Sequence, residues 1–170
     1  MSLTVILVII FAVAMMVGPV FMLQPSRRQR HLADTRTSAA KLGLTVRLAK
    51  RSADKSLSKK AIAVYTAGWP VHEGKKFSPG AIVLARVDYQ HELHLAEYWS
   101  LVSGNLILDS PVRPVLEKHL QTLSPSIQGV EVNAGGVGLY WSEREGEDFL
   151  PQLKTQIEAL GISLMPFFFR

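Results

Sequence analysis

The chain begins with an almost unbroken run of apolar residues. Only one threonine, one glycine and one proline interrupt residues 3–23, and residues 1–23 carry no charged side chain. Because a helix rises about 1.5 Å per residue, such a run matches the roughly 30 Å hydrocarbon thickness of a bilayer. A helix on the surface of a globular protein would show polar residues at helical spacing, and this run shows none. The pattern predicts one transmembrane helix over residues 1–23.

A cleaved signal peptide is the alternative, because residues 12–14 read Ala-Val-Ala and resemble a cleavage site. No Lys or Arg precedes the run, however, and apolar residues continue beyond that site, so we expect the segment to be retained. Arg27, Arg28 and Arg30 follow directly, and basic residues flank membrane helices on the cytoplasmic side. The sequence thus predicts a single-pass membrane protein with a cytoplasmic C-terminal body and an N-terminus on the opposite side of the membrane. The three arginines are expected to contact lipid headgroups of the anionic inner leaflet.

Periodicity then predicts the elements of the body. Residues 24–43 have the helical spacing and the basic charge of a juxtamembrane stalk helix, with Ser26 as its cap. Residues 44–48 alternate apolar and polar side chains, as a half-buried strand does. Short apolar runs at residues 61–66 and 81–89 predict two more strands. Residues 93–102 fit a helix or a strand, and residues 106–108 favour a strand.

The C-terminal third has clearer patterns. Helical stripes predict helices over residues 114–123 and 149–160, the second ending at Gly161 before an apolar tail over residues 162–169. Between them, strands around residues 130–132 and 137–141 flank a glycine-rich turn. We therefore predict an α+β domain over residues 44–170, made of antiparallel strands with two helices in its C-terminal half. Tyr-Trp-Ser recurs at residues 98–100 and 140–142, each time before a predicted helix, so a ββα duplication is a further possibility.

Composition and charge narrow the class of protein. The 170 residues include no cysteine, which excludes a disulfide framework and Cys-ligated metal centres. Residues 24–60 contain eleven basic and two acidic side chains, whereas residues 61–170 contain eight basic and twelve acidic ones. The basic segment fits the anionic leaflet. A ribosome or nucleic-acid tether is the alternative, but the segment has no aromatic residue for base stacking, so nucleic acid is not the expected partner.

Candidate chemistry is sparse. His91 and His94 could hold a metal ion if they shared a helix face, but on a strand they would point to opposite faces, and their spacing is not that of H-E-x-x-H. No nucleophile motif occurs, and the glycines of residues 133–138 join two predicted strands instead of preceding a helix. We expect no catalytic residue, no cofactor site and no metal site. The alternative is a membrane-tethered, metal-dependent hydrolase that uses the two histidines.

Aromatic side chains are the remaining candidates for function. Neighbouring strand residues face opposite sides of a sheet, so part of the Tyr-Trp pairs must point outward, where aromatic residues serve as protein contacts. The apolar C-terminal tail packs on the body, enters lipid or binds a partner. The candidate protein-contact residues are Trp69, Tyr98, Trp99, Tyr140, Trp141, Phe167, Phe168 and Phe169.

The junction that follows the apolar run reads Gly18-Pro19-Val20-Phe21-Met22-Leu23-Gln24-Pro25-Ser26-Arg27-Arg28-Gln29-Arg30. It resembles uncharacterised single-pass inner-membrane proteins of Gram-negative bacteria, and in layout the preprotein translocase accessory subunit YajC. The resemblance implies a non-catalytic accessory or assembly protein that presents a cytoplasmic α+β domain to a membrane complex. The body over residues 44–170 is much longer than that of YajC, so no functional residue is carried over.

Overall fold

The computed structural model describes residues 2–22, 24, 26–50, 61–70, 77, 81–87, 95–96, 98–104 and 110–169. The chain forms two compact units, residues 1–33 and residues 34–170, and helix α2 (Arg27–Lys41) crosses the boundary between them. Ser26 caps this helix as predicted: its hydroxyl accepts a hydrogen bond from the Gln29 amide at 3.3 Å, and the Gln29 side chain accepts one from the Ser26 amide at 2.8 Å. This reciprocal pair is a capping box, which satisfies two backbone donors at the helix start.

The first unit contains helix α1 (Leu3–Met22), whose large apolar side chains between Leu3 and Val17 are exposed. A membrane span needs both length and sustained apolarity. Among the residues that the structure describes, no helix meets both requirements. This finding overturns the prediction of a transmembrane helix over residues 1–23. The single-pass topology and the inner-membrane localisation predicted from that helix are therefore wrong as well.

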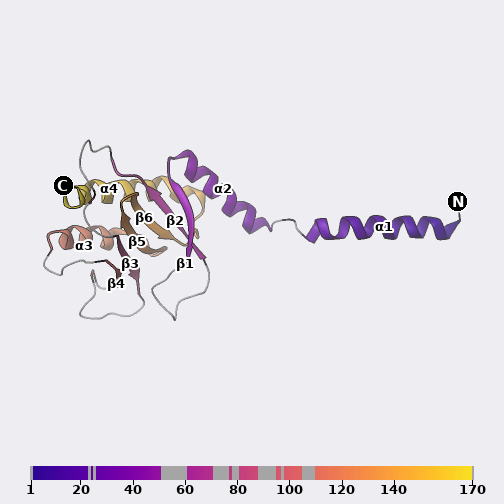
Figure 1. Ribbon diagram of the computed structural model, residues 1–170, viewed down its shortest axis with the longest axis horizontal. Coiled ribbons are helices and arrows are strands. Elements are labelled where there is room, and N and C mark those ends of the chain that lie inside the picture. Colours follow the sequence, from indigo (N-terminus) through magenta and orange to yellow (C-terminus); the bar gives the residue numbers. More distant parts are fainter. Residues whose placement is uncertain are drawn as a thin grey trace. The chain divides into compact units, whose positions relative to one another are not determined.

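The second unit is built around one antiparallel sheet (Figure 1). The strand order is β1-β2-β6-β5-β3-β4, so β1 and β4 form the two edges of the described sheet. Helix α3 (Val112–Thr122) follows β4, and a short 3₁₀ turn (Glu147–Phe149) leads from β6 into α4 (Leu150–Phe168). The strands are β1 (Thr45–Lys50), β2 (Ala61–Ala67), β3 (Ile82–Arg86), β4 (Trp99–Ser103), β5 (Ile127–Asn133) and β6 (Gly136–Trp141).

The core lies between the sheet and helices α3 and α4. Strand β6 shows the alternation clearly: Val137, Leu139 and Trp141 belong to the core cluster, whereas Tyr140 lies on the opposite face of the sheet. The buried stripe of α3 consists of valine and leucine, and that of α4 consists of leucine and isoleucine together with Gly161 and Phe168. An α+β body with antiparallel strands is therefore the architecture of the chain, and only the transmembrane helix of the predicted fold class is wrong.

One local prediction is corrected, and one open alternative is resolved in part. Helix α4 does not end at Gly161 but continues to Phe168, through Pro166. Leu164 and Phe168 extend its buried stripe, and burying them outweighs the helix-breaking tendencies of glycine and proline. Residues 99–102 of the segment that fits a helix or a strand belong to strand β4. The predicted strand at residues 106–108 lies outside the described residues.

The recurring Tyr-Trp-Ser triplet does not mark equivalent positions. The order of elements does contain two strand pairs that are each followed by a helix, namely β3-β4-α3 and β5-β6-α4. Trp99, however, begins β4, whereas Trp141 ends β6. Both indoles are buried in the core. The triplet therefore reflects a shared need for a large core residue near a strand end, at different registers.

Glycines permit two close approaches within the sheet. A Cβ atom on Gly136, where φ is +145°, would lie 2.0 Å from the carbonyl oxygen of Ala67. A Cβ atom on Gly138 would lie 2.8 Å from the hydroxyl of Thr66. Strands β2 and β6 thus approach each other more closely at this end than a pair of side chains would allow.

Candidate functional site

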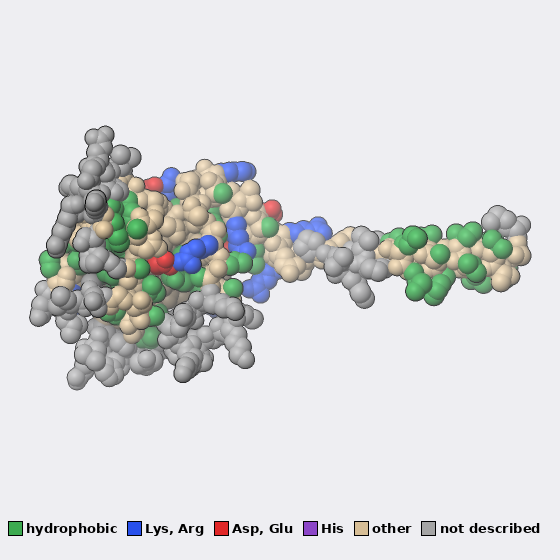
Figure 2. Space-filling model, in the orientation of Figure 1, with side chains coloured by type: hydrophobic (Ala, Val, Ile, Leu, Met, Phe, Trp, Pro, Cys, Tyr) green, Lys and Arg blue, Asp and Glu red, His purple; other side chains and the backbone are tan. Residues whose placement is uncertain are grey.

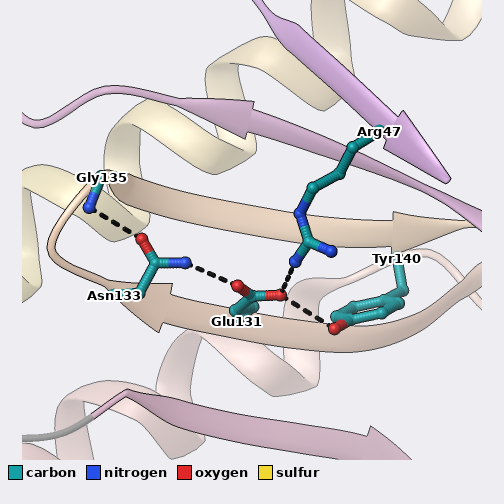
Figure 3. Close-up of polar contacts among 5 residues, drawn as sticks. All are labelled: Arg47, Glu131, Asn133, Gly135 and Tyr140. Carbon is teal, nitrogen blue, oxygen red and sulfur yellow. Dashed lines mark hydrogen bonds and ion pairs between the residues drawn. The ribbon is translucent and has the colours of Figure 1, made fainter. Parts of the chain in front are cut away.

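A polar cluster crosses the face of the sheet opposite α4. Arg47 on β1 pairs in register with Val64 on β2, and Val64 pairs with Tyr140 on β6. The guanidinium of Arg47 reaches the carboxylate of Glu131 on β5, which lies three strands away in the sheet order (Figure 3). Glu131 pairs in register with Gly138, whose missing side chain leaves room for this contact. The cluster therefore fastens the edge strand β1 to the middle of the sheet.

Glu131 is the centre of this cluster. Its carboxylate accepts hydrogen bonds from Arg47, from the Tyr140 hydroxyl at 2.8 Å and from the Asn133 amide at 2.5 Å. The side-chain oxygen of Asn133 accepts a hydrogen bond from the Gly135 backbone amide at 2.8 Å, and this bond shapes the turn between β5 and β6 (Figure 3). Burial, followed by the hydrogen bond to Glu131, raises the pKa of Tyr140. A carboxylate with three donors has its main acceptor positions occupied, so the cluster is a structural brace.

A second carboxylate joins α2 to the sheet. Glu143, directly after the β6 segment, accepts hydrogen bonds from Arg36 at 2.8 and 2.7 Å and from the Tyr65 hydroxyl at 2.7 Å. The hydrogen bond to Glu143 raises the pKa of Arg36, and burial, together with Glu143, raises that of Tyr65. The contact orients the second half of α2 and hence the connection into β1.

That connection borders a groove of about 380 Å³ in the second unit. Its walls come from the end of α2 and the segment that leads into β1, from the end of β2 and the start of β6, and from one flank of α4 that includes the buried Ile157 and the exposed Ile162. Lys154 and Glu158 lie 3.6 Å apart along α4 and are the charged residues of the lining. The lining residues are Leu42, Gly43, Leu44, Ala67, Gly68, Trp69, Pro70, Val137, Lys154, Ile157, Glu158, Gly161 and Ile162.

The groove is apolar and accessible. Ile162 on its rim is 62% exposed, so an apolar side chain is accessible beside the pocket. Gly161 leaves space in the wall, since a Cβ atom there would meet nothing closer than Val137 at 3.8 Å. The indole nitrogen of Trp69 donates to the Asn133 carbonyl at 2.8 Å and so holds the ring in place. The groove can therefore receive an apolar group without rearrangement of its walls.

The structure separates the aromatic candidates into buried and accessible side chains. Trp99 and Trp141 are in the core, and Tyr140 lies under the polar cluster described above. Phe168 and Phe169 are buried and contact the rings of Trp69 and Phe77, so the tail packs on the body. Tyr98 is exposed, and Trp69 and Phe167 are half-buried. Of these candidates, only Trp69 lines the groove.

The remaining candidates lie elsewhere. His91 and His94 fall outside the described residues, and the described residues contain no group of three or more His, Cys, Asp or Glu side chains that could hold a metal ion. Arg27, Arg28 and Arg30 are exposed on the first turn of α2, but the transmembrane helix on which their predicted headgroup contact depended is not supported. The pattern of the sequence missed the groove altogether. The one feature of the sequence that indicates the groove is Ile162, an apolar residue on the otherwise polar side of α4.

Comparison with models of known protein families, with curated proteins and with solved structures finds no match.

Proposed function

We propose that the chain is a non-catalytic protein-binding domain that serves as an accessory subunit of a larger assembly. Its docking surface consists of the groove and the adjoining edge strand β1. The observation that carries this proposal is the apolar groove with an exposed isoleucine on its rim. Protein interfaces bury apolar anchors in pockets of this kind, surrounded by a polar rim.

The charge around the groove favours a partner with acidic residues. Lys41 is exposed next to the lining residue Leu42. On the face that Figure 2 shows, basic side chains (blue) cover more of the surface than acidic ones (red). The sequence of residues 41–60 is strongly basic throughout. Complementary charge speeds association and selects among partners.

The internal ion pair of the rim is no obstacle to docking. Lys154 and Glu158 are separated by one helical turn, and their side chains are 35% and 51% exposed. Such an exposed pair contributes on the order of 0.5 kcal/mol, so separating it when a partner binds costs little. A carboxylate of the partner can then pair with Lys154, and the carboxylate of Glu158 is hydrated. The groove therefore combines an apolar floor with an adaptable edge.

A pull-down with a matched pair of variants tests the proposal. Full-length chain is immobilised and exposed to extract of the cells that produce it, with and without nuclease treatment, and bound proteins are quantified by mass spectrometry. Ile162→Glu places a charge on the groove rim, whereas Gln152→Glu adds the same charge at an exposed position of α4 outside the lining. We expect a defined set of proteins to bind the parent chain and Gln152→Glu, and binding to Ile162→Glu to fall about tenfold or more.

Two results would contradict this function. If the three chains retain the same proteins in the same amounts, the groove does not bind them. If the bound set disappears on nuclease treatment alone, the chain acts through nucleic acid, as a tether. Circular dichroism of both variants verifies that the added charge leaves the fold intact, which is expected for exposed positions.

A further inference from the structure

Strand β1 is an open edge of the sheet. It pairs with β2 on one side, and no strand in the described part of the chain pairs with its other side. An edge strand presents backbone donors and acceptors at every second residue, and a second chain can pair with them. The opposite edge, β4, is less suited to pairing. Its register with β3 shifts at Val83 and Leu84, and Leu95 already bridges to Trp99.

The geometry of β1 suits the addition of a full strand. All six residues from Thr45 to Lys50 pair with β2 without a register shift. Proteins commonly protect an edge with a bulge, a proline or charged side chains. β1 contains neither a bulge nor a proline, and its basic residues oppose a basic strand but not an acidic one. The brace from Arg47 to Glu131 also fixes the strand to the sheet. A rigid, regular edge loses little conformational entropy when a partner binds.

The side chains of β1 differ between its two faces. On the helix side, Val46 is half-buried and Leu48 is 59% exposed, so that side offers apolar contacts. On the other side, Thr45 is exposed, and the Arg47 side chain is 47% exposed. In an added strand, neighbouring residues face opposite sides. The complementary segment therefore alternates apolar residues with acidic ones.

This charge also argues against a second copy of the chain as the occupant. In an antiparallel pairing of β1 with itself centred on Arg47, the two Arg47 side chains would meet across the two-fold axis. In every other register two strands that each carry Arg47 and Lys50 but no acidic residue would lie side by side, and like charges on paired strands are destabilising. The sequence on either side of β1, from Lys41 to Lys60, adds more positive charge. An acidic segment is attracted by this positive charge instead of being repelled by it.

We infer that β1 binds an extended, acidic segment of a partner protein by strand addition, with its apolar side chains against Val46 and Leu48. This inference rests on the protein-binding function proposed above and specifies how the partner is held. The first residue before β1, Leu44, lines the groove. A segment paired with β1 thus leads directly to the apolar pocket, and one partner can occupy both.

Fluorescence anisotropy with full-length chain tests the inference. The probe is the six-residue peptide Val-Glu-Val-Glu-Val-Glu, which has the length of β1, with fluorescein at its amino terminus. The control probe carries Lys in place of Glu. We expect saturable binding of the acidic probe, weakened by added salt, and affinity for the basic probe about tenfold or more lower. Hydrogen exchange of the complex should show slowed exchange of β1 amides and unchanged exchange of β4 amides.

A pair of leucine variants locates the contact. Leu48→Asp alters the exposed leucine of β1, and Leu101→Asp alters the exposed leucine of β4 at the other edge. We expect Leu48→Asp to abolish binding of the acidic probe and Leu101→Asp to leave it unchanged. The inference is overturned if the acidic probe does not bind, if both probes bind equally, or if Leu101→Asp is the variant that loses binding. If strand addition fails while the pull-down still depends on Ile162, the proposed function stands and only this binding mode is rejected.

Discussion

The carboxylate of Glu143 accepts both hydrogen bonds that the Arg36 guanidinium donates to it, at 2.8 Å from Nε and 2.7 Å from Nη2, across 107 positions of sequence. Glu143 has a positive φ of 57°, a conformation that non-glycine residues rarely adopt. The strained residue persists because its side chain is held by Arg36 and Tyr65. The Glu143 carboxylate thus fixes the path of the chain after β6 and the position of the second half of α2 on the sheet.

Removal of this carboxylate should destabilise the second unit. We expect Glu143→Ala to lower the free energy of unfolding by about 2 kcal/mol, because it leaves Arg36 and Tyr65 without their acceptor. In a double-mutant cycle with Arg36→Ala, the coupling energy should exceed about 1 kcal/mol. Urea unfolding followed by circular dichroism measures both quantities. The exposed Glu147 serves as the control, and an equal loss of stability in Glu147→Ala would contradict the assignment.

Tyr140 should make stability fall in alkaline solution. Burial and the hydrogen bond to Glu131 raise its pKa in the folded state, whereas the unfolded chain ionises near the ordinary value of about 10. Its contribution is therefore complete below about pH 10 and is lost as the pH rises through the folded-state value. Urea unfolding between about pH 8 and pH 11 should show a shallower decline for Tyr140→Phe than for the parent chain.

The exposed Tyr98 provides the comparison for that experiment. Tyr98→Phe removes a tyrosine hydroxyl at the surface, so the change in Tyr140→Phe should exceed the change in this variant. If Tyr140→Phe and the parent chain declined in parallel, the hydroxyl of Tyr140 would not be held by Glu131 in the folded protein.

His119 should make stability fall in acidic solution. Burial, and then the charge of Lys118, lower the pKa of His119, whose Nε2 lies 3.0 Å from the Ser163 hydroxyl between α3 and α4. Because the folded state disfavours the added proton, the contribution is complete above about pH 6.5 and is lost as the pH falls through that value. His119→Gln should unfold with less dependence on pH between about pH 7.5 and pH 5.5. Equal pH dependence in the two chains would argue against a buried neutral imidazole.

The exposed apolar surface of α1 should govern behaviour in water. Large apolar side chains from Leu3 to Val17 are uncovered in the first unit, and such surface favours association. We expect a chain that begins at Ser26 to be monodisperse in light scattering at concentrations where the full chain forms larger particles. Particles of equal size for both chains would show that α1 does not drive association.

Periodicity predicted the regular parts of the second unit because each has one buried face. The alternation over residues 44–48 and the stripe of α3 lead to β1 and α3 with boundaries that differ by a few residues. Gly161 was misleading because local propensity favours a helix end there, while the buried stripe continues to Phe168. The first apolar segment was interpreted as a membrane span because of its length and apolarity, but no described helix is both long enough and apolar enough to cross a membrane.

The candidate site could not be predicted in the same way. Its groove is formed by residues 42–44, 67–70 and 154–162, which meet only because β1 lies beside β2 and α4 crosses below them. The brace between Arg47 and Glu131 depends on the order of four strands, which no local pattern encodes. Aromatic residues drew attention in the sequence, yet most of them are in the core or its border. The two most exposed large apolar side chains in the described part of the second unit are instead aliphatic, namely Leu48 and Ile162.

The close approach of Gly136 to Ala67 also has a use in comparing genomes. Any side chain at position 136 would collide with the backbone oxygen of the neighbouring strand. This position should therefore tolerate amino-acid substitution less well than the leucines around it. A distant homologue can lose every surface residue described above and still be expected to keep glycine there. The position thus offers a fixed point from which divergent members of this lineage can be aligned.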